Sequence, residues 1–272
     1  MKETSYKELV QLMVGRELNE IYTKPAVTPG KKVLEVRNLS SGTRVKQVSF
    51  SLYKGEILGF YGLVGSGRSE LMRTIFGIDP LTGGEIHVGG QKAAIQSPKD
   101  AIRFGIGFVP ENRKEQGAIL IQSVSYNISL SVLDTLVKMF QVDRKQESAL
   151  ADEYIEKLSI RTPSPEQQLI NLSGGNQQKA IISKWLAMKP DILILDEPTR
   201  DRCRRQKRNL LHHVGVGPSG VSIIMVSSEL PEIIHMSTRV ITMHEGTISG
   251  VLTNENEISQ ENILTYATGG VK

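Results

Sequence analysis

Hydrophobic and polar residues alternate over residues 33–39 and 45–52, and small turn residues at 40–43 separate the two stretches. Such alternation is typical of strands that bury one face, so it predicts an antiparallel β lobe. The continuous apolar run at 57–63 instead predicts a strand that is buried on both faces. A glycine-rich segment follows this strand, and residues 69–76 have the spacing of a helix that Gly77 ends.

Strands and helices continue to alternate along the rest of the chain. From about residue 95 to 170 the composition favours helices, with apolar stripes at 127–140 and 147–158, so we expect an inserted helical subdomain. The later predicted elements are a helix at 173–189 capped by Ser173, strands at 192–195 and 221–226, a short helix at 231–236 and a closing hairpin at 239–251. These elements predict an α/β domain over residues 31–272.

Residues 1–30 are predicted to be a helix followed by a linker. Apolar residues at 5–22 have helical spacing, and Pro25 and Pro29 then break the pattern. The charged start has no apolar core of a signal peptide, and no later run approaches the roughly 20 apolar residues that cross a bilayer. The single cysteine, Cys203, rules out an internal disulfide and fits a reducing compartment such as the cytosol.

The formal charge of +4 depends on one short basic segment at residues 202–208. This segment has no interleaved aromatic residues and no nucleic-acid-binding motif beside it. We therefore expect no nucleic-acid partner. The five histidines show no metal-ligand spacing with cysteine, so we expect them to be structural.

Residues 62–69 match the phosphate-binding pattern G-x-x-x-x-G-K-[ST] at every fixed position except the lysine, which is Arg68. The glycines let successive backbone N–H groups point at phosphate oxygens, and the helix that follows adds its positive end. The predicted nucleotide-binding residues are Gly62, Leu63, Val64, Gly65, Ser66, Gly67, Arg68, Ser69 and Glu70. Arginine brings a planar fork where a compact ammonium normally binds, so we expect weaker binding or impaired hydrolysis. An ordinary glycine-rich turn is the alternative.

Two carboxylates end the apolar strand at 192–195. Asp196 and Ser69 are predicted to hold a Mg²⁺ ion, and Glu197 is the candidate catalytic general base that polarises the attacking water. An Asp-Glu pair that caps a helix is the alternative.

The segment LSGGNQQK at residues 172–179 adds a third motif. With the DEPT and GLVGSGRSE segments, it makes the chain resemble the second ATPase half of the ABC-type sugar import proteins for ribose, galactosides, xylose and arabinose. The resemblance implies the ABC version of the P-loop NTPase fold, with ATP and Mg²⁺ as cofactors. It also implies that the signature residues complete the nucleotide site of a partner domain; these are Leu172, Ser173, Gly174, Gly175, Asn176 and Gln177.

The same resemblance implies partners. Residues 13–16 resemble the junction after the first half of the fused family proteins, so an N-terminal ATPase half is expected before this domain. Membrane permease subunits are expected to dock on the helical subdomain, and a sugar-binding protein outside the membrane would act indirectly. The expected location is the cytoplasmic face of the cell membrane, where ATP binding and hydrolysis drive import.

The chain departs from common ABC ATPases at several positions. Glu111 stands at the Q-loop position, Ser228 stands at the switch-histidine position, and no aromatic residue lies in 40–47 to stack on adenine. Arg68 fits the family's second half, which is known for a degenerate phosphate loop. Two rival functions stay open: a decayed domain that binds nucleotide without hydrolysing it, and a non-transport ABC ATPase that acts on nucleic acid.

Residues 201–218 do not resemble the D-loop and helix of the family. They can be encoded so that the same bases, read one position later, give IDVGAKSEIYYIMSELA, which does resemble them. We hypothesise a pair of compensating frame shifts, which the nucleotide sequence would test.

Overall fold

The computed structural model describes residues 30–198, 220–254 and 256–270. The predicted helix and linker over 1–30, apart from Gly30, lie outside these ranges, and so does the segment 201–218.

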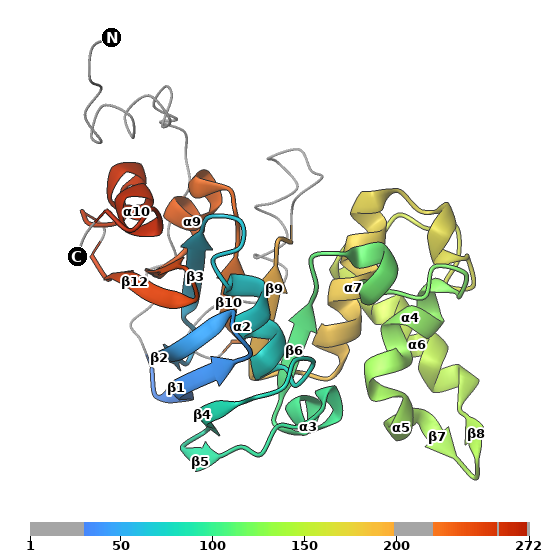
Figure 1. Cartoon of the computed structure of the whole chain (residues 1–272). Helices are drawn as coiled ribbons and strands as arrows, with labels where there is room; N and C mark the ends of the chain where they lie inside the picture. The colour runs from blue at the N-terminus through green and yellow to red at the C-terminus, as the bar shows by residue number, and fades with distance from the viewer. Residues whose placement is uncertain (1–29, 199–219, 255, 271–272) are drawn as a thin grey trace.

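A six-stranded sheet forms the centre of the molecule, in the order β12-β11-β3-β10-β9-β6 (Figure 1). Its strands are β3 (Ile57–Gly62), β6 (Ile106–Val109), β9 (Ile192–Asp196), β10 (Ser222–Val226), β11 (Arg239–His244) and β12 (Thr247–Leu252). All neighbouring pairs are parallel except β11 with β12. Every residue of β3, β6, β9 and β10 is buried, as expected for parallel strands covered on both faces.

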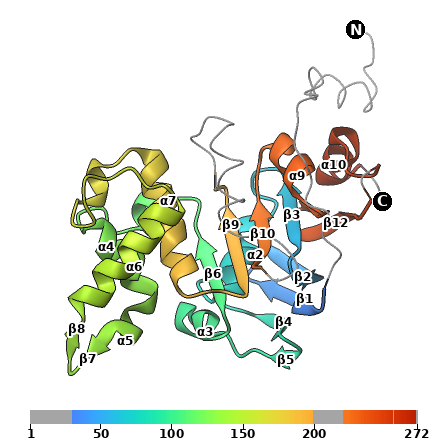
Figure 2. The same ribbon diagram turned by 180° about the vertical axis from the view of Figure 1, so that it is seen from behind.

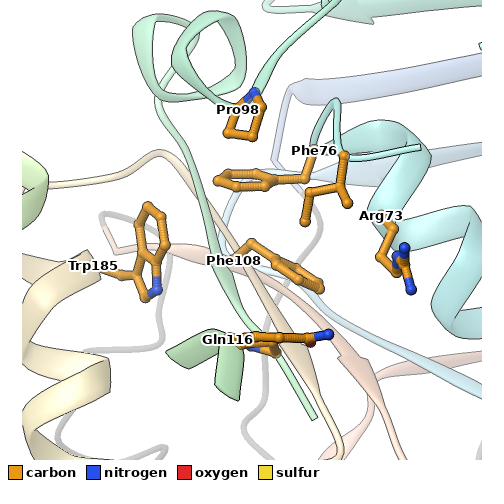
Figure 3. Close-up of a pocket in the computed structure, with 8 residues that line it drawn as sticks. Arg73, Phe76, Pro98, Phe108, Gln116 and Trp185 are labelled. Carbon is orange, nitrogen blue, oxygen red and sulfur yellow. The ribbon is translucent and has the colours of Figure 1, made fainter. Parts of the chain in front are cut away.

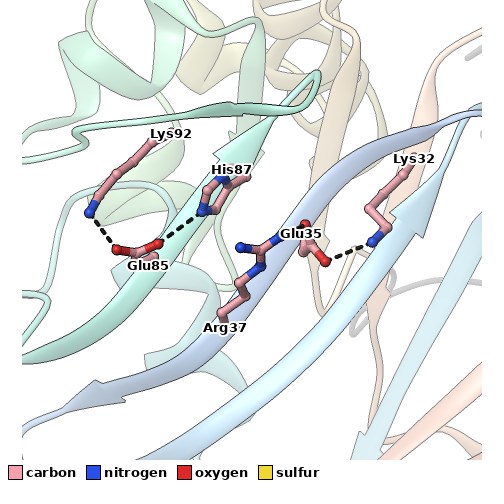
Figure 4. Close-up of polar contacts among 6 residues, drawn as sticks. All are labelled: Lys32, Glu35, Arg37, Glu85, His87 and Lys92. Atoms are coloured by element: carbon pink, nitrogen blue, oxygen red, sulfur yellow. Dashed lines mark hydrogen bonds and ion pairs between the residues drawn. The ribbon is translucent and has the colours of Figure 1, made fainter.

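A second, antiparallel sheet has the order β2-β1-β4-β5. It consists of β1 (Lys32–Ser41), β2 (Val45–Tyr53), β4 (Gly83–Val88) and β5 (Gln91–Lys92). Residues on β1 alternate between buried and more exposed positions, which confirms the predicted β lobe. The more exposed side chains of β1, β4 and β5 form two ion-pair groups, Glu35 with Lys32 and Arg37, and Glu85 with His87 and Lys92 (Figure 4).

Helices cover the sheets and form a separate group at one side (Figures 1 and 2). The helices near the sheets are α2 (Arg68–Ile75), α3 (Pro98–Arg103), α9 (Leu230–Met236) and α10 (Gln260–Ala267). The side group contains α4 (Val124–Ser129), α5 (Leu133–Leu136), α6 (Arg144–Lys157) and α7 (Gly174–Ala187), with the hairpin β7 (Val137–Lys138) and β8 (Gln141–Val142). Short helical turns are η1 (Arg113–Gly117), η2 (Leu130–Val132) and η3 (Leu169–Asn171).

The prediction of one helix over residues 127–140 is wrong. The segment is divided into α4, η2 and α5, followed by the short strand β7 and a turn at Met139 and Phe140, whose φ angles are 47° and 67°. Val132 and Val137 are β-branched and favour other conformations, and the Ser131 hydroxyl donates to the carbonyl of Lys184 on α7. The predicted helical region from about 95 also contains α3 and β6, and β6 pairs with β9 in the central sheet.

Candidate functional site

The loop between β3 and α2 has the backbone form that the glycine pattern predicts. Gly65 and Gly67 have φ angles of 83° and 95°, in the left-handed region that glycine tolerates best. A Cβ atom on Gly62 would lie 2.4 Å from the Met243 carbonyl oxygen, and one on Gly67 would lie 2.5 Å from the Arg44 carbonyl oxygen. These three glycines therefore allow a tight curl that larger residues would prevent.

Two turns from distant parts of the sequence hold this loop. The Gly246 N–H donates to the Ser66 carbonyl oxygen at 3.0 Å, and Gly246 lies in the β11–β12 turn. The Lys46 N–H at the start of β2 donates to the Gly246 carbonyl oxygen at 2.8 Å. The phosphate-binding loop is thus fixed by both the β1–β2 and β11–β12 turns.

Ser69 and Asp196 meet at the base of the loop. The Ser69 hydroxyl, in the first turn of α2, donates to Asp196 Oδ1 at the end of β9 over 3.1 Å. Burial raises the pKa of Asp196 to about 6, and the bond from Ser69 opposes this rise. A serine hydroxyl and a carboxylate are oxygen donors of the kind that Mg²⁺ takes beside nucleotide phosphates, so these two residues fit the predicted ion.

Glu197 lies beside this pair and has a φ angle of 47°. Its N–H donates to the Val226 carbonyl oxygen at 2.9 Å, and its Oε2 accepts a bond from the Ser228 hydroxyl at 3.1 Å. Burial raises the pKa of Glu197, and the charge of Arg68 opposes the rise. The structure therefore brings the predicted base and the predicted switch position into contact.

The Arg68 side chain is only 8% exposed and is bound at the carboxyl ends of the central strands. Its Nη1 donates to the Ser227 carbonyl oxygen at 2.9 Å, and its Nη2 lies 4.0 Å from Glu197 Oε1. The guanidinium also lies 5.9 Å from the centre of the Tyr61 ring. Burial lowers the pKa of Arg68, while Glu197 and Asp196 oppose this change. Arg68 thus offsets part of the charge of the two carboxylates.

The signature residues lie at the start of α7, among the helices of the side group (Figure 1). Ser173 occupies the N-cap position of this helix, as predicted, but its side chain makes no cap bond to the backbone; its hydroxyl instead accepts a bond from Asn176 Nδ2 at 3.1 Å. Gln177 is buried, and its Nε2 donates to the carbonyl oxygens of Leu169 and Leu172. These bonds fix the turn that presents the signature glycines.

Glu111 is exposed just after β6, in the loop that leads to η1. The neighbouring Arg113 lies against Gly174, because a Cβ atom there would be 2.9 Å from Arg113 Nη2. The segment that follows Glu111 therefore contacts the signature segment through Arg113. By contrast, α2 packs against β3 and β9 of the central sheet, whereas α7 packs against α4, α6 and β6.

A pocket of about 290 Å³ is lined by residues at α2, α3 and α7 (Figure 3). Phe76 stacks on Phe108 with ring centres 5.3 Å apart, and it meets Trp185 edge-on at 5.4 Å. The lining residues are Arg73, Phe76, Ile78, Pro98, Phe108, Pro110, Gln116 and Trp185. Among the described residues, no hydrogen-bond acceptor reaches the buried Arg73 Nε or Trp185 Nε1.

The described residues contain no group of three or more His, Cys, Asp or Glu side chains placed to hold a metal ion. Within the same residues, no helix has both the length and the apolar character needed to cross a bilayer.

Comparison with known proteins connects this geometry to a family. The family model described as "ABC transporter" matches residues 45–200. The chain is 48% identical over 269 residues to the ribose import ATP-binding protein RbsA of Bacillus licheniformis, covering 98% of this chain and 54% of that protein. It is 47% identical to RbsA of Yersinia pestis, covering 96% of this chain and 52% of that protein. The chain spans about half the length of the curated relatives it matches.

Solved structures agree on the fold. A nucleotide-free ATP-binding cassette from an ABC transporter matches with a TM-score of 0.73 at 18% identity, covering 86% of this chain and 96% of that one. A dimeric ATP-binding cassette in a post-hydrolysis state with ADP and Pi matches with a TM-score of 0.69 at 19% identity, covering 81% and 98%.

Proposed function

Because the chain belongs to the ABC transporter family, we propose that it is the ATP-binding, energy-coupling domain of a monosaccharide importer. The Ser69–Asp196 contact beneath the phosphate-binding loop is the observation that carries the ATP-binding part of the proposal. The likeness to ribose import proteins over 98% of the chain supports the sugar-import part.

The residues of the site have separate tasks in this proposal. The loop N–H groups around Gly65 bind the phosphates, while Ser69 and Asp196 hold Mg²⁺. The ion would neutralise charge that develops on the phosphates. Glu197 accepts a proton from the attacking water, and Ser228 positions the Glu197 carboxylate through their hydrogen bond.

We also propose that this domain is the second of two ATPase halves and that its phosphate-binding loop is degenerate. Arg68 supports this, because its guanidinium is committed to the Ser227 carbonyl and to Glu197 instead of remaining available to phosphate. The signature residues at the start of α7 would then complete the nucleotide site of the N-terminal half.

The pocket between α2, α3 and α7 is the proposed docking site for a permease segment at the cytoplasmic face of the membrane. Its aromatic walls would take an apolar side chain of the permease. A sugar-binding protein would act on the permease from the other side.

Calorimetry and turnover of the chain assembled with an N-terminal half test the catalytic proposal. The Glu197→Gln variant is expected to bind Mg-ATP as the wild type does and to lose hydrolysis at this site by roughly 10²–10⁴-fold. If the wild type hydrolysed ATP at this site no faster than the Glu197→Gln variant, Glu197 would not be a working base. Absence of Mg-dependent ATP binding would remove the nucleotide-binding proposal altogether.

A charge placed in the pocket tests the permease proposal. Ile78 lines the pocket and is 44% exposed, so Ile78→Asp should leave folding and ATP binding intact. We expect this variant to lose co-purification with the permease and to lose ribose uptake. Ile121→Asp, at an exposed position that does not line the pocket, is the matched control. If Ile78→Asp and Ile121→Asp supported equal ribose uptake, the permease would dock at a different site.

A further inference from the structure

We propose that Arg44, in the turn between β1 and β2, supplies the phosphate-binding cation that the loop lacks. The inference rests on the proposed function, because it requires that the loop between β3 and α2 binds a nucleoside triphosphate. It assigns to Arg44 the role that the loop pattern gives to position 68.

The loop's own arginine is already engaged. Arg68 is 8% exposed, donates to the Ser227 carbonyl oxygen at 2.9 Å and lies 4.0 Å from Glu197. Moving its guanidinium to a phosphate would leave two buried carboxylates without their counter-charge. Another cation near the loop would bind phosphate without that cost.

The backbone of Arg44 is fixed against the loop. Its carbonyl oxygen lies 2.5 Å from the places where Cβ atoms on Gly67 and on Gly246 would stand, so the two glycines admit it at close range. The next bond on the same hairpin, from Lys46 N–H to the Gly246 carbonyl, secures the turn. The root of the Arg44 side chain therefore has one position relative to the phosphate-binding loop.

The guanidinium of Arg44 lies at the exposed side of the loop. Its Nη1 is 3.7 Å from the place where a Cβ atom on Gly65 would stand, and both residues are exposed. Guanidinium is charged at all working pH values and presents several N–H donors in one plane, which suits phosphate oxygens. Because Gly65 lies at the centre of the loop that curls around phosphate, phosphate is the part of the nucleotide that Arg44 is placed to contact.

The test measures the affinity of the full chain for ATP and for inorganic tripolyphosphate, which has no base. Arg44→Gln should weaken the binding of both ligands by roughly tenfold and should lower the salt dependence of binding, because one charge-assisted contact is lost. Arg37→Gln is the matched control, since Arg37 is exposed on the same hairpin but pairs with Glu35. Thermal unfolding checks that both variants fold.

Each outcome separates this inference from the proposed function. Equal affinities for wild type, Arg44→Gln and Arg37→Gln would overturn the role of Arg44 while ATP binding stands. Weaker ATP binding with unchanged tripolyphosphate binding would place Arg44 on the base and would also overturn the phosphate contact. A wild-type chain that binds neither ligand would overturn the proposed function itself.

Discussion

At the scale of single residues, the site is a balance between buried carboxylates and one buried guanidinium. Asp196 is 2% exposed, and its charged form is supported by the Ser69 hydroxyl and by Arg68. Desolvation still dominates and raises the pKa of Asp196 to about 6. The domain therefore stores an unfavourable charge where a metal ion is expected, a common property of binding sites.

The Asp196→Asn variant tests this charge. The pKa of Asp196 in the folded state lies above its ordinary value of 3.8. The free energy of unfolding of the wild type therefore falls as pH rises from about 4 to 6, and this contribution does not change further at higher pH. Asparagine does not ionise and keeps the oxygen that Ser69 contacts. At pH 8 the free energy of unfolding without nucleotide should therefore be about 1 to 3 kcal/mol higher in the variant, and the difference should vanish near pH 4.

Denaturant unfolding at several pH values measures this difference. Asp191→Asn, at an exposed position that pairs with Lys54, provides the control and should show no such trend. The same Asp196→Asn protein should lose the Mg²⁺ dependence of ATP binding. If the free energy of unfolding changed with pH in the same way in the wild type and in Asp196→Asn, the Asp196 carboxylate would ionise without destabilising the folded chain.

At the scale of elements, close approach between strand β3 and helix α9 is set by a glycine. A Cβ atom on Gly59 would lie 2.2 Å from Ser237 Oγ and 2.9 Å from Ser237 Cβ. The strand that leads into the phosphate-binding loop therefore packs directly on the end of α9. Any larger residue at position 59 has to push that end outward.

Gly59→Ala is expected to lower the free energy of unfolding by about 1 to 3 kcal/mol, because the core has to shift to admit one methyl group. Urea unfolding measures this change in the free energy of unfolding. Gly83→Ala is the control, since its Cβ would make an ordinary contact of 3.6 Å with Ser40. Adding Ser237→Ala removes the nearer clashing atom and should restore part of the loss. Equal stability of the two glycine variants would contradict the packing argument.

The elements also show what could be predicted from the sequence. Strands β3, β9 and β10 are continuous apolar runs, and their prediction is confirmed. Strand β4 has only Ile86 fully buried and begins with two glycines, so its pattern does not stand out. Strand β6 has four residues, too few to show a period. Both depend on neighbours that are distant in the sequence.

The contacts of the site can also be divided into those that the sequence predicts and those that it does not. The pairing of Ser69 with Asp196 follows from the two motifs that contain them, whereas the contact between Glu197 and Ser228 arises because β9 and β10 are adjacent parallel strands. Lys184 is a further case, since helical periodicity does not reveal that its Nζ donates to the Gly117 carbonyl oxygen at 2.6 Å. Burial lowers the pKa of this lysine to about 8.

At the scale of the whole molecule, the two motif-bearing regions lie in different parts of the structure. The phosphate-binding loop lies on the central sheet, while the signature turn lies among the side group of helices. Since the chain covers about half of its curated relatives, we infer that its signature turn acts on a nucleotide held by the other half. The two regions should then respond separately to substitution.

Ser173→Arg tests this separation. Ser173 is exposed at the start of α7, so the variant should fold and bind ATP on its own loop as the wild type does. In an assembly with an N-terminal half, ATP turnover should fall by roughly tenfold or more, because a bulky side chain replaces a small polar group at the other nucleotide. Ala149→Arg, exposed on α6, is the control. Weaker ATP binding by the isolated Ser173→Arg chain would contradict action across the interface.

The bond from Gly246 N–H to the Ser66 carbonyl oxygen also has a consequence for biosynthesis. Strand β3 is made before its sheet neighbours β10 and β11, which begin at residues 222 and 239, and Gly246 follows them. The loop therefore takes its final form only after the ribosome has synthesised the whole segment from Ser66 to Gly246. ATP can stabilise the finished domain, but it cannot bind the completed loop before Gly246 has been synthesised.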